Sequence, residues 1–83
     1  MSKKVTFNQL QRTLSALGFE KRAEGTHMIF RHVRTGAVVT VPSFETIVRP
    51  VYLHTVARQV ANSGIASSTT FEAKLTEAAK DAA

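Results

Sequence analysis

The segment from Phe19 to Pro42, FEKRAEGTHMIFRHVRTGAVVTVP, decides the fold. Two glycine-bearing turns, at residues 24–25 and 35–36, separate three short runs that are rich in Phe, Ile, Val and Thr. Such residues favour strands, and short loops of this kind join antiparallel neighbours. Pro42 ends the last run, because proline has no N–H to donate to a ladder. The segment therefore predicts a three-stranded antiparallel meander.

A helix is predicted immediately before the meander, from Phe7 to Leu17. Thr6 is the candidate N-cap and Gln9, three residues later, completes a capping box. Gly18 stands where a C′ glycine ends a helix. The apolar positions at helical spacing are Phe7, Leu10, Leu14 and Leu17, and Val5 is placed to pack on Leu10 as a hydrophobic staple.

A second helix is predicted after the meander and the loop that follows it. Pro50 suits the first helical position, and the segment Asn62-Ser63-Gly64 ends the pattern. The apolar stripe of this helix consists of Leu53, Val56, Ala57 and Val60. The order helix, three strands, helix predicts an α+β fold in which both helices cover one face of the sheet and the other face stays open.

The last segment, residues 66–83, is rich in alanine and differs in composition from the rest. A second capping box, formed by Thr69 and Glu72, predicts a short appended helix that frays. We therefore divide the chain into a folded part, residues 1–65, and a C-terminal helical tail, residues 66–83. The role of the tail stays open between a third packed helix, a partner-binding helix and a loosely ordered end, because a helix of this length is marginal alone in water.

The charge of the chain is concentrated in the folded part. The net charge is +5, and residues 1–65 hold nine Lys and Arg against three Glu, whereas the tail is slightly acidic. A basic domain favours a polyanionic partner, nucleic acid first, because phosphate contacts release counterions. Solubilising charge alone is the alternative explanation.

Composition excludes several kinds of chemistry. The chain has no cysteine, which rules out disulfides, cysteine nucleophiles and thiolate metal sites and favours a cytosolic protein. It has no apolar run long enough to span a membrane and no apolar leader, so we expect no membrane association. No histidines or carboxylates are paired at metal-ligand spacing, and no cofactor-binding loop is present, so we expect neither a metal nor a cofactor.

The register of the predicted meander directs attention to one histidine. If residues 24–25 and 35–36 are two-residue turns, Arg22 faces His27 and Phe30 faces Val41. One sheet face then carries the core, and the other is an open, basic face with Glu20, Arg22, His27, Ile29, Arg31 and Thr40.

His27 on this face is the candidate catalytic residue. The neighbouring arginines are expected to disfavour its protonation, which leaves an imidazole that accepts a proton near pH 7. A general base beside phosphate-binding arginines suits RNA cleavage through the ribose 2′-OH. A solvated surface histidine is the plainer interpretation. His32, at the core-side edge, and His54, on the second helix, are weaker candidates.

Three stretches resemble the HicA family of messenger-RNA-cleaving toxins. They are LGFEKRAEGTHMIFRH (residues 17–32), VRTGAVVTVP (residues 33–42) and LHTVARQVANSGI (residues 53–65). The resemblance covers about residues 5–65 and leaves the alanine-rich tail unmatched. Its most specific part is Gly-Thr-His followed, at this spacing, by Val-Pro.

The resemblance implies a double-stranded-RNA-binding-domain-like α-β-β-β-α fold and a metal-independent endoribonuclease that cleaves mRNA. It also implies neutralisation by a cognate HicB-type antitoxin protein. The catalytic histidine of the family falls on His27, and the turn that positions it falls on Gly25 and Thr26. Beside it we expect Arg22, Arg31, Lys21 and Lys4 to bind RNA, the two arginines above all.

The chain departs from the family pattern after Val-Pro. Family members often carry a second histidine there, whereas this chain has Phe44, and the proton donor for the leaving oxygen is unassigned. A non-catalytic RNA-binding module is therefore the alternative function. A protein-interaction domain is a third possibility, with Ile29 and residues 44–48 as the contact patch, and Ile29 is equally a candidate for a dimer contact.

Overall fold

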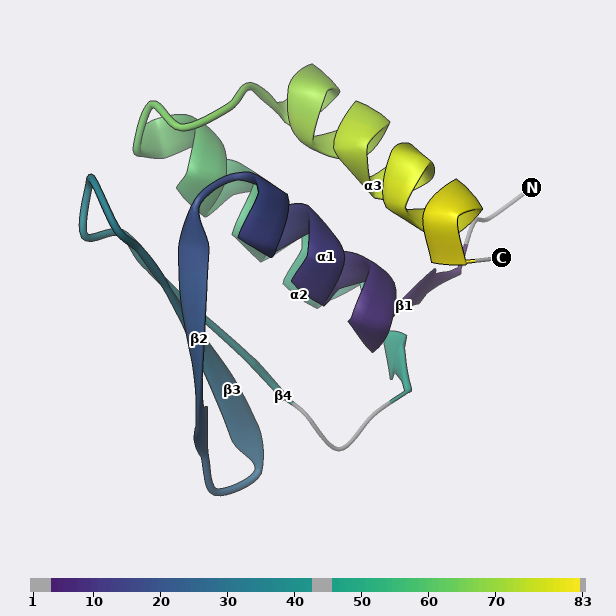
Figure 1. Ribbon diagram of the computed structural model, residues 1–83, viewed down its shortest axis with the longest axis horizontal. Helices are drawn as coiled ribbons and strands as arrows, with labels where there is room; N and C mark the ends of the chain where they lie inside the picture. The colour runs from purple at the N-terminus through teal and green to yellow at the C-terminus, as the bar shows by residue number, and fades with distance from the viewer. Residues whose placement is uncertain (1–3, 43–45, 83) are drawn as a thin grey trace.

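The computed structural model describes residues 4–42 and 46–82, with side chains through Ala78. The chain forms an α+β fold with a three-stranded antiparallel sheet and three helices, as the sequence predicts at this coarse level (Figure 1). No helix among the described residues is long and apolar enough to cross a membrane. The elements in chain order are β1 (Val5–Thr6), α1 (Phe7–Ala16), β2 (Phe19–Glu24), β3 (His27–His32), β4 (Val38–Pro42), β5 (Ile47–Val48), α2 (Pro50–Asn62) and α3 (Ser68–Ala82).

The local signals at the ends of α1 are confirmed. The Thr6 hydroxyl accepts the Gln9 N–H at 3.0 Å, and Gln9 Oε1 accepts the Thr6 N–H at 3.4 Å, so both halves of the capping box form. Gly18 follows the helix with φ +99°, a conformation that residues with a Cβ rarely adopt. The ends of α2 are also as predicted, with Pro50 in the first turn and Asn62 as the last helical residue.

The main sheet has the strand order β2-β3-β4, but both predicted registers are wrong. His27 pairs with Glu24 and not with Arg22, because the two-residue loop is Gly25-Thr26. On the other side, Phe30 pairs with Val39 and not with Val41. The loop between β3 and β4 is five residues long and is closed by a hydrogen bond from the His32 N–H to the Ala37 carbonyl at 2.8 Å.

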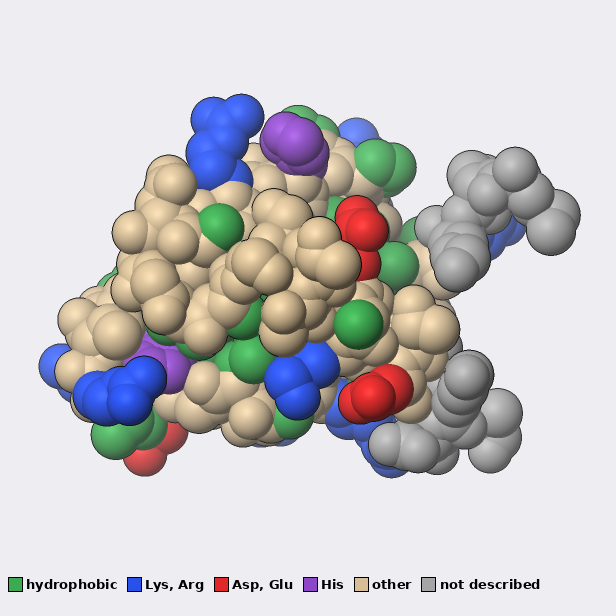
Figure 2. Space-filling model, turned by 90° about the horizontal axis from the view of Figure 1, so that it is seen from above, with side chains coloured by type: hydrophobic (Ala, Val, Ile, Leu, Met, Phe, Trp, Pro, Cys, Tyr) green, Lys and Arg blue, Asp and Glu red, His purple; other side chains and the backbone are tan. Residues whose placement is uncertain are grey.

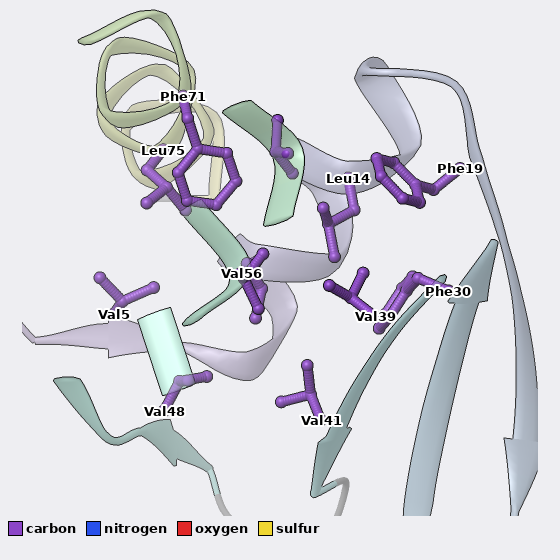
Figure 3. Packing of buried hydrophobic residues seen from close by; sticks show 12 residues of the cluster. Val5, Leu14, Phe19, Phe30, Val39, Val41, Val48, Val56, Phe71 and Leu75 are labelled. Carbon is purple, nitrogen blue, oxygen red and sulfur yellow. The ribbon is translucent and has the colours of Figure 1, made fainter. Parts of the chain in front are cut away.

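The register errors leave every side chain on its predicted face. Each pairing is displaced by two residues, and side chains in a strand alternate with a period of two. The inward face of the sheet therefore still carries the core residues Phe19, Phe30, Val39 and Val41, which meet α1 and α2 (Figure 3). Met28, on the same face, is partly buried against this core. We call the outward face the open face; it carries Glu20, Arg22, Glu24, His27, Ile29, Arg31, Val38 and Thr40.

The C-terminal helix is part of the core. Phe71 is 1 % exposed and Leu75 and Ala78 are buried, and α3 packs on α1 and α2 (Figure 3). Gln9 Nε2 also donates to the Leu75 carbonyl at 2.7 Å in a buried position. Burial of a large apolar side chain contributes about 1.5–3 kcal/mol, so Phe71 and Leu75 together contribute several kcal/mol. The prediction of a short appended helix is therefore wrong, because α3 has 15 residues, more than α1 or α2, and the geometry selects the third packed helix among the roles left open for residues 66–83.

Two smaller features were not predicted correctly. The N-terminal cap of α3 is Ser67 and not Thr69, since the Ser67 hydroxyl accepts the Thr70 N–H at 3.2 Å. A second, two-stranded sheet pairs β1 with β5 and holds Val5 opposite Val48, both buried. Strands of two residues carry no recognisable alternation, which is why the sequence did not indicate them.

Candidate functional site

The tip of the β2–β3 hairpin presents His27 to solvent. Gly25 is the first residue of the two-residue loop and has φ +61°, whereas Thr26 has a negative φ. This pattern is that of a type II′ turn, which requires glycine at the first position. A Cβ on Gly25 would meet nothing within 4 Å, so the backbone conformation alone calls for glycine. The hairpin tip projects beyond the helices (Figure 1).

His27 is the first residue of β3 and lies on the open face, where it is exposed. Its Nδ1 is 3.2 Å from the Thr26 hydroxyl oxygen. If Nδ1 carries the proton, it donates to this oxygen and the Nε2 lone pair faces solvent. In that tautomer Thr26 orients the ring, and Nε2 is the nitrogen with a free lone pair.

The surroundings of His27 differ from the expected cluster of arginines. Glu24 is its direct cross-strand partner, and the Glu24 carboxylate accepts a hydrogen bond and ion pair from the Arg22 guanidinium at 3.0 Å. Arg22 is therefore engaged with a carboxylate two residues away on the same face. The expected cationic neighbourhood of His27 is wrong at this position, because the register places a carboxylate there.

Further along the same face the charges also balance. Arg31 is exposed and stands directly opposite Glu20, and Arg22 is opposite Ile29. These side chains, with Lys21 and Val38, line a shallow hollow of about 420 Å³. Two arginines and two glutamates give the open face no net formal charge besides His27, so the prediction of a basic face is wrong.

The register puts neither predicted lysine on the face that carries His27, although the Lys21 side chain, on the edge strand, also borders the hollow on that face. The Lys21 residue is opposite Phe30 on the helix side of the sheet, and its ammonium donates to the Gln11 side-chain oxygen at 3.0 Å. Lys4 is exposed and directly precedes β1, which lies at a different edge of the molecule from the hairpin tip (Figure 1). The structure brings together His27, Gly25, Thr26, Arg22 and Arg31 and separates Lys4 from them.

The other two histidines have different surroundings. His32 is 5 % exposed, its Nδ1 accepts the Thr35 N–H at 3.1 Å, and its Nε2 lies 2.9 Å from the Leu17 carbonyl oxygen. Its ring meets Phe19 edge-on with centroids 5.0 Å apart. His54 is exposed on α2. His32 therefore has a structural role, and the sequence interpretation of a core-side residue is confirmed.

Among the described residues, no three histidines, carboxylates or other ligand residues gather in a group that could hold a metal ion. Phe44, which stands where a second catalytic histidine was considered, lies outside the described residues together with Glu45, whereas residues 46–48 of the 44–48 patch are described. Ile47 is 40 % exposed, and Ile29 is half-buried on the open face.

A second hollow, on the helix side of β2, was missed by the sequence analysis. It is lined by Asn8, Gln11, Arg12, Ser15 and Lys21. The signal was present, since residues 8, 11, 12 and 15 recur at the spacing of one helix face and are all polar. On the face that carries α3, by contrast, Lys and Arg side chains are spread around the rim and form no single cluster (Figure 2).

No protein-family model, no curated protein and no solved structure matches this chain. The assignment of a function therefore rests on the residues and geometry described above.

Proposed function

We propose that this protein is a metal-independent endoribonuclease of the messenger-RNA-cleaving toxin type, with His27 as its general base. The observation that carries the proposal is an exposed imidazole on a hairpin tip, next to Gly25 and with Nδ1 in contact with the Thr26 hydroxyl. A small basic domain without cysteine is compatible with RNA chemistry in the cytoplasm. The order α1-β2-β3-β4-α2 supports a double-stranded-RNA-binding-domain-like arrangement.

The proposed reaction uses the ribose of the substrate as the nucleophile. His27 Nε2 takes the proton of a 2′-OH, and the 2′ oxygen forms a bond to the adjacent phosphorus as the bond from phosphorus to the 5′ oxygen breaks. The leaving 5′ oxygen takes a proton from solvent. The products carry a 2′,3′-cyclic phosphate and a 5′-OH. Arg31 lies on the same face four residues along β3 from His27, about 13 Å away, and its proposed role is to bind a phosphate of a neighbouring nucleotide.

The decisive experiment is a cleavage assay in EDTA that compares wild type with His27→Ala and scores 2′,3′-cyclic phosphate ends. General base catalysis supplies about 10²–10⁴-fold, and we expect a loss of that size. His54→Ala is the matched control, because it removes an exposed histidine from α2. Equal cleavage by wild type and His27→Ala would refute the role of His27.

The second candidate function is an RNA-binding module without cleavage. The ion pair between Arg22 and Glu24 favours it, because this arginine is already satisfied by a carboxylate and is less free to bind a phosphoryl group. A-form RNA can be recognised by shape, 2′-OH and phosphate contacts alone. Intact RNA with both proteins, together with equal salt-sensitive binding, would select this function.

The proposal includes a protein partner, a HicB-type antitoxin, that covers the open face and blocks the substrate. The open face offers Val38, 46 % exposed, and half-buried Ile29 as apolar contacts beside two arginines. The open face itself has balanced charges, but the net charge of +5 on the whole chain favours a partner with acidic groups through long-range steering. Val38→Arg is expected to weaken such a complex, and competition between partner and RNA would test whether they share the face.

A further inference from the structure

The hollow between α1 and β2 has a lining of an unusual kind. Its side chains are two amides, one hydroxyl and two cations, from Asn8, Gln11, Ser15, Arg12 and Lys21. No carboxylate lines it. The two arginines of the open face, by contrast, stand beside or opposite glutamates. Positive charge is thus better exposed on the helix side of β2 than on the side that carries His27.

Two consecutive hydrogen bonds link three of the side chains that line this hollow, Lys21, Gln11 and Asn8. The Lys21 ammonium donates to Gln11 Oε1 at 3.0 Å, and Gln11 Nε2 donates to Asn8 Oδ1 at 3.2 Å. The lysine is therefore positioned by a neutral oxygen that leaves its charge uncompensated. An ammonium has three donors, so two remain for a ligand.

Arg12 stands beside this chain on the same exposed face of α1 and is itself exposed. Within the side chains that the structure describes, the ion pair found is Arg22–Glu24, so neither Arg12 nor Lys21 is in an ion pair there, although Glu77 and Lys74 of α3 line a neighbouring hollow with Arg12. The first turn of α1 also contains no acidic residue. A guanidinium presents donors in a fork that matches the oxygens of a phosphate group.

The size and chemistry of the hollow select among ligands. Its volume of about 540 Å³ falls in the range of ligand sites, but it has no aromatic side chain and no large apolar one to anchor a small molecule or a peptide. Amides and a hydroxyl both donate and accept, as does a ribose 2′-OH, whereas the cations suit phosphates. The lining therefore fits the sugar–phosphate backbone of RNA better than an acidic peptide.

We propose that the hollow lined by Asn8, Gln11, Arg12, Ser15 and Lys21 is a phosphodiester-binding subsite for RNA. It deepens the proposed function and rests on RNA being the substrate. Because β2 is an edge strand, an RNA strand can cross it from this hollow to the open face. Lys21 and Glu24, the partner of His27, are three residues apart along β2, a span of about 10 Å. The subsite holds the backbone near the nucleotide presented to His27.

The test measures binding and not cleavage, so that it is independent of catalysis. All proteins carry His27→Ala, and the probe is a fluorescein-labelled 12-nucleotide single-stranded RNA of mixed sequence. Arg12→Gln/Lys21→Gln is compared with Arg34→Gln/Arg58→Gln, which removes the same charge from exposed residues of the β3–β4 loop and α2. Affinity is measured by fluorescence anisotropy across a range of NaCl concentrations, and thermal melting checks the fold of each variant.

The expected result is a specific loss of phosphate contacts. For single strands the slope of log affinity against log salt is about 0.7 per phosphate contact, so Arg12→Gln/Lys21→Gln should lower its magnitude by about 1.4. Its affinity in 0.1 M NaCl should fall about tenfold, and the control double variant should keep the wild-type slope.

Three results would overturn the subsite. The first is an equal change in both double variants, which would indicate general charge and no site. The second is equally tight binding of a labelled 12-residue polyglutamate that is lost in Arg12→Gln/Lys21→Gln, which would make the hollow a site for acidic peptides. The third is a complete lack of RNA binding by the parent protein. If wild type fails to cleave RNA in the separate cleavage assay but the binding slopes are as expected here, the catalytic proposal is refuted and the subsite is still supported.

Discussion

The two ends of β3 carry a histidine each, and the structure treats them in opposite ways. His32, at the base of the hairpin, is 5 % exposed and bonded at both ring nitrogens. His27, five residues earlier at the tip, is exposed, with one polar contact at Nδ1. Because Nδ1 of His32 accepts the Thr35 N–H, the ring proton sits on Nε2 and is donated to the Leu17 carbonyl. Both ring nitrogens of His32 form hydrogen bonds within the fold, whereas for His27 a contact is found only at Nδ1 among the described residues.

Two residues of the same type can differ in how many of their hydrogen-bonding groups the fold has already satisfied. A neutral imidazole always has one donor and one acceptor, so its role depends on how many of these the protein has already satisfied. In His32 both groups are hydrogen-bonded to the backbone: the donor to the Leu17 carbonyl at the end of α1, and the acceptor to the Thr35 N–H in the β3–β4 loop. For His27 the polar contact found among the described residues is at Nδ1, and none is found there at Nε2. The four predictions below test this contrast, from the largest expected effect to the smallest.

His32→Ala should produce the largest loss of stability. It leaves the Leu17 carbonyl and the Thr35 N–H without their side-chain partner and opens a cavity beside Phe19. We expect the free energy of unfolding to fall by about 3 kcal/mol and Tm by more than about 10 °C. Urea unfolding of this variant and of His54→Ala measures it. A change no larger than that of the control would contradict the structural role of His32.

Gly18→Ala should cause the next largest loss of stability, because the added methyl group would crowd the His32 ring. A Cβ at Gly18 would lie 3.1 Å from His32 Nε2, and the residue has φ +99°. Gly64→Ala is the matched control, with φ +74° and nothing within 4 Å of the added carbon. We expect about 1 kcal/mol from backbone strain in the control and about 2 kcal/mol at Gly18. Equal losses in calorimetry would show that the contact with His32 does not matter.

Glu24→Gln tests the surroundings of His27, the exposed histidine at the hairpin tip. The change removes the carboxylate that faces His27 and releases Arg22 from its ion pair. RNA affinity in 50 mM NaCl is expected to rise two- to fivefold, by about the small energy typical of an exposed pair. Glu72→Gln on α3 makes the same charge change and should leave the affinity close to wild type. A rise of the same size in both variants would mean that net charge alone is responsible.

His27→Ala should have the smallest effect on the fold. The side chain is exposed and its described polar contact is with the neighbouring Thr26 hydroxyl. Substitutions at such positions usually change stability by less than about 0.5 kcal/mol. Chemical unfolding of His27→Ala beside wild type measures the change. A loss close to that of His32→Ala would remove the distinction between the two ends of the hairpin.

The sequence predicted the helices well, because their signals are local. The capping box at Thr6 and Gln9, Pro50 in the first turn of α2, and Gly18 and Gly64 after α1 and α2 are signals that act within a few residues of the helix ends. The packing of α3 was left open. It depends on the contact between Gln9 and the Leu75 carbonyl, which are 66 residues apart, and no local pattern encodes such a contact.

The candidate site was predicted in part for a related reason. Period-two alternation placed His27, Arg22 and Arg31 on one face correctly, and a displacement by two residues does not change the face. The turn itself was placed one residue too early, because glycine can occupy more than one position in a two-residue loop. That single step exchanged Arg22 for Glu24 opposite His27 and reversed the expected electrostatics.

The position of α3 in the core affects how the protein folds during its synthesis. Leu10 and Leu14, near the start of the chain, share one core with Phe71 and Leu75. A ribosome adds residues from the N-terminus onward, so α1 must wait for α3 to emerge before that core can close. The core that anchors the His27 hairpin is therefore completed only after the residues of α3 have left the ribosome.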